Sequence, residues 1–68
     1  MKKEQIGLNA GIIGQSLYQN GNVKIIDIKK NIKMKIEDIY LALGWLAREN
    51  KIHFLEIEKE VAICLINS

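Results

Sequence analysis

Two hydrophobic periods follow one another along this chain of 68 residues, and their order constrains the fold more than any other feature. Apolar residues recur at helical spacing over residues 6–20 and, most regularly, over 36–50. Two β-prone runs then occupy 52–57 and 61–66, at a spacing that suits an antiparallel hairpin. The sequence therefore predicts long helices first and a two-stranded hairpin after them.

Two shorter elements are predicted between the long helices. Gly21 follows the first helix as a stop signal, because glycine accepts the left-handed conformation at a helix C-terminus. Residues 23–25 are β-prone but too short for more than a single paired strand, and Ile28 and Ile32 after them are spaced as in a helix. The whole pattern is an α+β fold that is mainly helical, with three helices, a short strand and a C-terminal hairpin.

The third predicted helix has one face for a core and another for a partner. Its core face collects the apolar side chains of Ile36, Ile39, Tyr40, Leu43, Leu46 and Ala47. Leu41 and Trp45 lie about 140° and 180° round the helix from Ile36, so they are expected to face solvent. An exposed tryptophan and leucine rimmed by charge are typical of a protein-binding site. The alternative is that the hairpin or a terminal segment covers the pair.

Two stretches of the sequence carry a resemblance to a known family. They are residues 6–11 (IGLNAG) and 40–49 (YLALGWLARE), the second followed by Lys51 and Ile52. These stretches, in this order of elements, resemble a family of short bacterial winged helix-turn-helix proteins of unassigned function. The resemblance covers nearly the whole chain and implies a winged helix-turn-helix fold with the hairpin as its wing. The sequence departs from the family pattern at Lys33, where glycine is common.

The length of the chain leaves room for one domain over residues 1–68 and for little beyond its own core. The side chains that could carry chemistry are isolated, since His53 is the single histidine and Cys64 the single cysteine. We expect His53, on a strand beside Leu55, to have a structural or surface role, and Cys64 to be a small apolar core residue, because no second cysteine or nearby basic cluster would activate its thiol. No catalysis, metal, cofactor or small-molecule substrate is therefore expected.

The predicted location is the cytoplasm. A single cysteine cannot form a disulfide within the chain, and this usage fits a reducing compartment. No run of about 18 consecutive apolar residues is present, so no membrane span is expected. The apolar stretch near the N-terminus is interrupted by glycine and polar residues, so we do not expect it to act as a signal peptide.

Positive charge is concentrated in the predicted second helix and the turn after it. Residues 24–35 carry five lysines and one aspartate, a net charge of +4, whereas residues 36–68 sum to −3. In a helix-turn-helix protein the third helix enters the major groove of DNA while the second crosses the phosphate backbone. Lysines placed there would neutralise phosphates and release counterions. The candidate contacts with double-stranded DNA are Lys24, Lys29, Lys30, Lys33 and Lys35.

Acidic residues near the same elements argue against this interpretation. Glu37 and Asp38 lie in the first turn of the predicted third helix. The helix dipole stabilises negative charge there, but both carboxylates would repel a DNA phosphate. Three glutamates surround the predicted wing turn: Glu56, Glu58 and Glu60. Two functions therefore stay open. One is a DNA-binding, transcription-regulatory domain, and the other is a non-catalytic module that binds protein through Leu41 and Trp45.

Apolar residues outside the predicted core indicate a homodimer. Leu8 and Ile12 fall opposite the core stripe of the first helix, so they need another partner. Leu55 and Ile57 give the hairpin a second apolar face. Together with the exposed pair of the third helix, they predict a dimer in which one chain covers what the other exposes. A dimer formed through the third helix would weaken DNA binding, because both would use the same face.

Overall fold

The computed structural model describes residues 2–66 and contains the predicted elements in the predicted order. These elements are α1 (Lys3–Asn20), β1 (Val23–Lys24), α2 (Ile25–Asn31), α3 (Ile36–Arg48), β2 (Ile52–Ile57) and β3 (Glu60–Leu65). Several boundaries differ from the prediction by one to three residues. Ile25 begins α2 instead of continuing the strand, α1 begins at Lys3, α3 ends at Arg48, and β3 runs one residue earlier than predicted. None of the helices described is long and apolar enough to cross a membrane. The predicted mainly helical α+β fold is confirmed.

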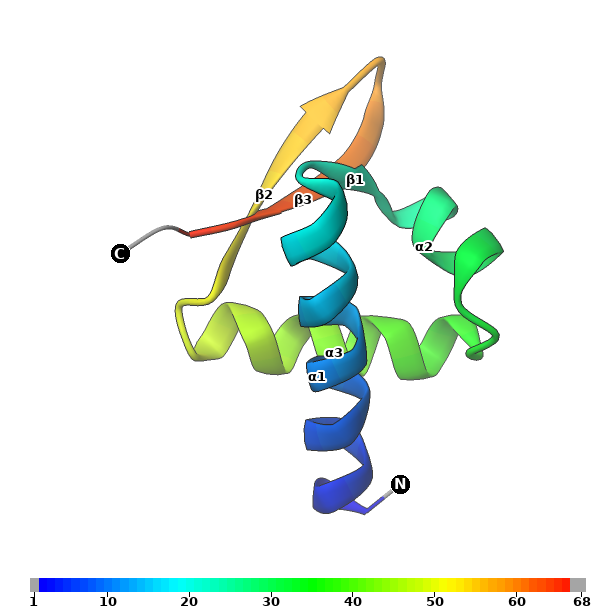
Figure 1. The fold of residues 1–68 in the computed structure, drawn as a ribbon, viewed down its shortest axis with the longest axis vertical. Helices are drawn as coiled ribbons and strands as arrows, with labels where there is room; N and C mark the ends of the chain where they lie inside the picture. The colour runs from blue at the N-terminus through cyan, green and yellow to red at the C-terminus, as the bar shows by residue number, and fades with distance from the viewer. Residues whose placement is uncertain (1, 67–68) are drawn as a thin grey trace.

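The three strands form one antiparallel sheet in the order β1-β3-β2. β2 pairs with β3 along its whole length, from Ile52 opposite Leu65 to Ile57 opposite Glu60. β1 adds a short pairing on the other edge of β3, where Val23 lies opposite Ile63. Figure 1 shows α1 crossing α3, with α2 beside one end of α3 and the β2–β3 hairpin rising away from α3. The hairpin is therefore the wing of the fold.

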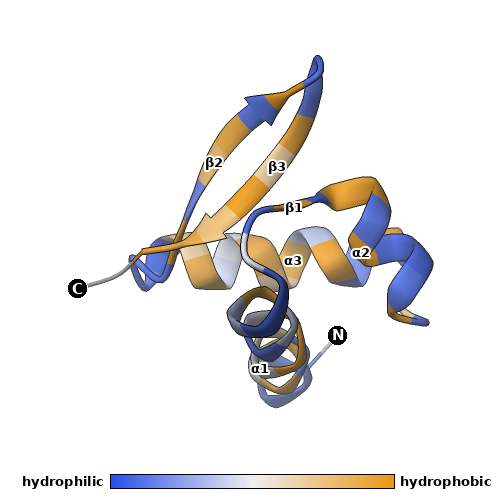
Figure 2. Ribbon diagram, turned by 45° about the horizontal axis from the view of Figure 1, so that its top comes forward, coloured by the Kyte–Doolittle hydropathy of each residue, from blue (hydrophilic) through white to orange (hydrophobic). Residues whose placement is uncertain are grey.

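The hydrophobic core lies where the three helices meet the sheet. Its largest fully buried side chains are Ile13, Leu17, Ile28, Ile39, Leu43 and Ile63. They belong to α1, α2, α3 and β3, and all of them form one continuous cluster. Figure 2 shows hydrophobic residues on α3 and along both strands of the hairpin. The short elements α2 and β1 are stable only as parts of this shared core, because neither is long enough to persist alone.

The buried side of α3 is rotated relative to the prediction. The sequence pattern puts Ile36 and Tyr40 in the core, but both are exposed, Tyr40 by 56%, while Ala42 is completely buried. The cause is α1, which crosses α3 beside Trp45: a Cβ atom on Gly7 would lie 4.0 Å from Trp45 Cζ2. Trp45 is half-buried and packs against the core, so the expectation that it faces solvent is wrong. The side of α3 that turns away from α1 is left open instead.

Two helices end in residues with positive φ. Gly21 has φ 73° and ψ −136°, a conformation that residues with a Cβ atom rarely adopt, and its N–H donates to the carbonyl of Leu17 at 2.8 Å. After α3, Asn50 has φ 56° and the N–H of Lys51 donates to the carbonyl of Leu46 at 2.9 Å, as in a Schellman motif. The prediction of Gly21 as a stop is confirmed, and Asn50 turns the chain from α3 into β2.

The connection between α2 and α3 does not need the glycine that is common in such turns. Its backbone is extended at both ends, with φ −115° and ψ 123° at Ile32 and φ −62° and ψ 146° at Lys35. The N–H of Met34 donates to the carbonyl of Ile32 at 2.8 Å. Lys33 is not among the described residues with positive φ. A lysine is therefore accepted here without backbone strain, and its side chain is exposed.

The tip of the wing is held against β1 by an ion pair. The chain turns through Glu58 and Lys59, whose φ values of 53° and 67° are the signature of a type I′ hairpin turn. The ammonium of Lys24 lies 2.7 Å from Glu58 Oε1 and 3.2 Å from Glu60 Oε2. Its hydrogen bond and its positive charge lower the pKa of the Glu58 carboxyl below that of a free glutamate.

Gly44 and Gly21 provide a matched test of backbone conformation. A Cβ atom on Gly44, inside α3, would meet no atom within 4 Å. Gly44→Ala is therefore expected to raise the free energy of unfolding by about 1 kcal/mol through helix propensity. Gly21→Ala is expected to lower it by roughly 1 to 3 kcal/mol, because alanine is strained at a positive φ outside the left-handed helical region. Urea denaturation followed by circular dichroism measures both changes, and a shift in the same direction for the two variants would contradict this account.

The contact between Lys24 and Glu58 predicts a pH dependence of the wing. Because the pKa of Glu58 is lower in the folded chain than in the unfolded chain, its contribution to stability is complete above the unfolded pKa. That contribution is lost as the pH falls through the folded pKa. An NMR titration of the Glu58 carboxyl carbon should show the lowered pKa, and Lys24→Met should raise it again. The same pKa in both proteins would mean that the ion pair does not form in solution.

Candidate nucleic-acid interface

Four exposed lysines lie together where α2 leads into α3. Lys29 and Lys30 belong to the last turn of α2, and Lys33 and Lys35 to the connection after it. We call these four residues the lysine segment. Within residues 2–66 the ion pairs involve Lys24 alone, so the four ammonium groups have no carboxylate partner there. The lysine segment can therefore receive an anion without first breaking an internal contact.

Lys24 stands apart from the lysine segment. Its side chain is only 22% exposed, and its ammonium is engaged by Glu58 and Glu60. These hydrogen bonds raise the pKa of Lys24, so its ammonium stays charged. A phosphate would have to displace two carboxylates to reach it. The structure therefore assigns Lys24 to the attachment of the wing, although the sequence pattern groups it with the other lysines.

The face of α3 that turns away from α1 is poor in positive charge. It presents Glu37, Tyr40, Leu41 and Arg48, with Leu41 47% exposed. The side chains that recognise a base pair by two hydrogen bonds are those of arginine, lysine, asparagine and glutamine. Only Arg48, in the last turn of α3, is of this kind. Tyrosine and leucine offer apolar contacts instead, so this face has little capacity to read a DNA sequence.

An apolar hollow beside this face was missed by the sequence pattern. It has a volume of about 300 Å³, lies between α2, α3 and β3, and is lined by Ile25, Ile26, Lys29, Ile36, Tyr40, Glu60 and Val61. The hollow exists because the side chains of Ile36 and Tyr40 point out of the core. One signal was present in the sequence: Ile25 and Ile26 are neighbours about 100° apart on a short helix, so both cannot be buried equally.

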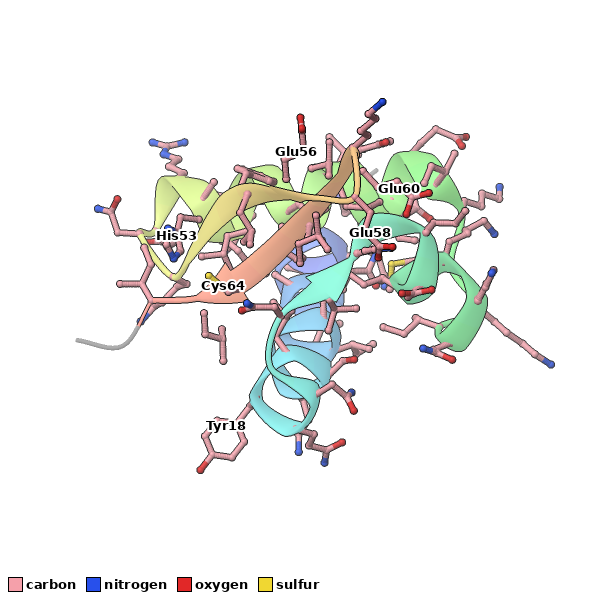
Figure 3. The ribbon with its side chains drawn as sticks, turned by 90° about the horizontal axis from the view of Figure 1, so that it is seen from above. Tyr18, His53, Glu56, Glu58, Glu60 and Cys64 are labelled. Atoms are coloured by element: carbon pink, nitrogen blue, oxygen red, sulfur yellow. The ribbon has the colours of Figure 1, made fainter. Side chains whose placement is uncertain are left out.

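The three glutamates of the wing do not form one acidic cluster. Neighbouring positions of the hairpin alternate between its two faces, which separates Glu56 from Glu60. Figure 3 shows Glu56 away from Glu58 and Glu60, which lie close to each other. The latter two share the ammonium of Lys24. The wing therefore repels phosphate less than its sequence implies.

His53 and Cys64 lie opposite each other on β2 and β3, as Figure 3 shows. His53 is exposed and the Cys64 thiol is half-buried. In the part of the chain that the structure describes, no three His, Cys, Asp or Glu side chains gather as they would around a metal ion. The structural roles expected for these two residues stay a prediction.

The apolar residues predicted to contact a second chain are spread over three elements. Leu8 and Ile12 are exposed on α1, and Leu41 is exposed on α3. Leu55 and Ile57 are half-buried on the wing. Since Trp45 packs against α1, the pair that was expected on α3 is reduced to Leu41. Of these predicted contact residues, the exposed pair on α1, Leu8 and Ile12, therefore forms the largest apolar surface on a single element.

Comparison with known proteins agrees with this architecture. Residues 1–65 match the family described as winged helix-turn-helix domain (DUF2582). The solution NMR structure of protein BT2368 from Bacteroides thetaiotaomicron is 31% identical to this chain with a TM-score of 0.83, and the match covers 96% of this chain and 79% of that one. No curated protein matches the sequence. The resemblance noted in the sequence is confirmed, and this chain belongs to the DUF2582 family of winged helix-turn-helix domains.

Proposed function

We propose that this chain is a small regulatory domain that binds double-stranded DNA, and that its lysine segment contacts the phosphate backbone. The observation that carries the proposal is the exposure of four lysines, without carboxylate partners among the described residues, directly before α3. In a helix-turn-helix domain the second helix and the turn after it approach the DNA backbone. A cytoplasmic location, predicted from the single cysteine, is part of the same proposal.

Phosphate contacts would supply most of the affinity, and the DNA sequence would add little. Each lysine that neutralises a phosphate releases condensed counterions, which makes binding depend steeply on salt. The outer face of α3 adds the apolar surface of Tyr40 and Leu41, which suits a thymine methyl group. Its carboxylate, Glu37, can accept a hydrogen bond from cytosine but repels phosphate. We therefore expect the domain to bind a DNA duplex mainly through its backbone, with only a weak preference for the base sequence.

Protein binding is the second candidate function. The sequence pattern bases it on Leu41 and Trp45, but the packing of Trp45 against the core removes half of that pair. The hollow between α2, α3 and β3 supports it instead, since Tyr40 and Val61 on its lining are more than half exposed. Lys29 also lines this hollow. A protein seated there and a DNA duplex would therefore compete.

A DNA titration at several salt concentrations tests the first proposal. Fluorescence anisotropy of a labelled duplex should show binding at low salt, with the logarithm of the affinity falling linearly with the logarithm of the salt concentration. Lys33→Ala should reduce the slope by about 0.9, and the combined change of Lys30, Lys33 and Lys35 to alanine should reduce it by about three times as much. Two duplexes of unrelated sequence should behave alike.

Lys51→Ala is the matched control for these variants. Lys51 is also exposed, but it follows the opposite end of α3 from the lysine segment. Its substitution should leave the slope unchanged. An equal effect of Lys33→Ala and Lys51→Ala would show that the charge of the whole chain matters and the lysine segment does not. Absence of binding at low salt would refute the proposal and leave protein binding as the better candidate.

A further inference from the structure

Beyond its first turn, which carries Lys3 and Glu4, the outward side of α1 is uncharged and exposes large apolar side chains. Residues 5–23 contain no Asp, Glu, Lys or Arg, which is unusual for the surface of a chain in which 26% of residues are charged. On this helix Leu8 is 65% exposed and Ile12 is 51% exposed. They are four positions apart, so their side chains stand one above the other and form a ridge.

A groove runs beside this ridge. It has a volume of about 510 Å³, and most of its lining is apolar: Gly7, Gly11 and Gly14 of α1, Trp45 and Leu46 of α3, and Leu65 of β3. The charged residues that also line it, Glu49 and Lys51, have opposite signs. Gly11 lies about 60° round α1 from Leu8, so the ridge and the groove are neighbours on the same helix.

Two of the glycines in the groove have no role in the packing of a single chain. Gly7 adjoins Trp45, but a Cβ atom on Gly11 or Gly14 would meet no atom within 4 Å. Glycine within a helix is less stable than alanine. The chain therefore carries weak helix formers at positions where its own fold leaves empty space, beside exposed apolar side chains that its own fold does not cover.

We propose that α1 is a homodimerisation surface, on which the Leu8–Ile12 ridge of each copy packs into the groove of the other. A symmetric dimer requires one patch that is complementary to itself, and a ridge beside a groove on one helix meets that requirement. The low charge of the ridge matters as well, since α1 carries no charged residue from residue 5 onwards and the charges of the groove, Glu49 and Lys51, have opposite signs. Around a two-fold axis a charged residue comes close to its own copy and repels it, whereas the amides of Gln15 and Gln19 can both donate to and accept from their counterparts.

This surface is distinct from the lysine segment. Figure 1 shows α1 crossing the middle of α3, while α2 and its connection lie at one end of α3. The inference keeps Leu8 and Ile12 from the dimer that the sequence predicted, but it does not use Leu41 or the wing and so leaves the outer face of α3 free. It goes beyond DNA binding and does not depend on it.

Sedimentation equilibrium tests the proposal over roughly 10 µM to 1 mM protein, the range in which a small interface associates. The unchanged chain should dimerise. Leu8→Glu should raise the dimer Kd about 100-fold, because the symmetry places two unpaired carboxylates in apolar surroundings. Leu8 is mostly exposed in the monomer, so the variant should fold, which circular dichroism checks. Leu41→Glu is the matched control on α3 and should leave the Kd unchanged.

The glycines give a second, independent readout. Gly11→Ala should raise the dimer Kd about tenfold, because its methyl group occupies the space that the partner's ridge needs. Gly44→Ala adds the same methyl group to α3 at another place and should not affect association. In a sample that mixes labelled and unlabelled chains, the methyl groups of Leu8 should show intermolecular NOEs to Trp45.

Three results would overturn the proposal. They are a chain that stays monomeric over the whole concentration range, a dimer that Leu41→Glu dissociates and Leu8→Glu does not, and equal effects of the two glycine substitutions. The first would leave the Leu8–Ile12 ridge as ordinary surface, and the second would move the interface to α3. The third would show that the ridge of one copy does not pack into the groove of the other. None of these results bears on the DNA titration, so the two proposals fail separately.

Discussion

The packing of α1 across α3 decides what the rest of the molecule exposes. Four of the fully buried side chains come from these two helices: Ile13 and Leu17 from α1, Ile39 and Leu43 from α3. Because α1 crosses beside Trp45, the buried side of α3 is turned towards Ala42, and Tyr40 is left outside. The outer face of α3 consequently exposes Tyr40 and Leu41 and is poor in positive charge, which lies mainly before the N-terminal end of that helix.

Charge in this chain is separated by element, and Lys24 neutralises part of the negative charge at the tip of the wing. α1 is uncharged from residue 5 onwards, the lysine segment is positive, and the wing is acidic. If Glu58 and Glu60 were free, the tip of the wing would bring negative charge close to the lysines of α2. Lys24 binds both carboxylates against β1. Its ammonium thereby offsets negative charge that would otherwise weaken the positive potential of the lysine segment.

Local signals in the sequence predicted the elements, and contacts between elements decided what they could not predict. Helical spacing, the helix stop at Gly21 and the two runs of the hairpin all depend on residues close together in the sequence. They could therefore be predicted from the sequence. A helical wheel gives an apolar stripe on α3 but does not say which neighbour covers it, and for that reason Tyr40 and Trp45 were misplaced. The turn through Glu58 and Lys59 was equally hidden, because both adopt a positive φ without being glycine or asparagine. The lysine segment was predictable, whereas the engagement of Lys24 depends on the wing folding back to β1.

If the lysine segment contacts phosphate as proposed, a dimer would bind DNA more tightly than one copy, and the size of the chain is compatible with this. Four such contacts would give one copy a salt slope of about 3.6, which is modest for a DNA-binding protein. Two half-sites on one side of a duplex are about 34 Å apart, and the longest dimension of this chain is 33 Å. Two copies joined through α1 are large enough to place their lysine segments that far apart, so the second contact becomes intramolecular and the affinity rises without new residues. A dimer joined through α3 would cover the face that approaches the duplex and lose this advantage. The two proposals, dimerisation through the Leu8–Ile12 ridge and phosphate contacts by the lysine segment, are therefore compatible with each other.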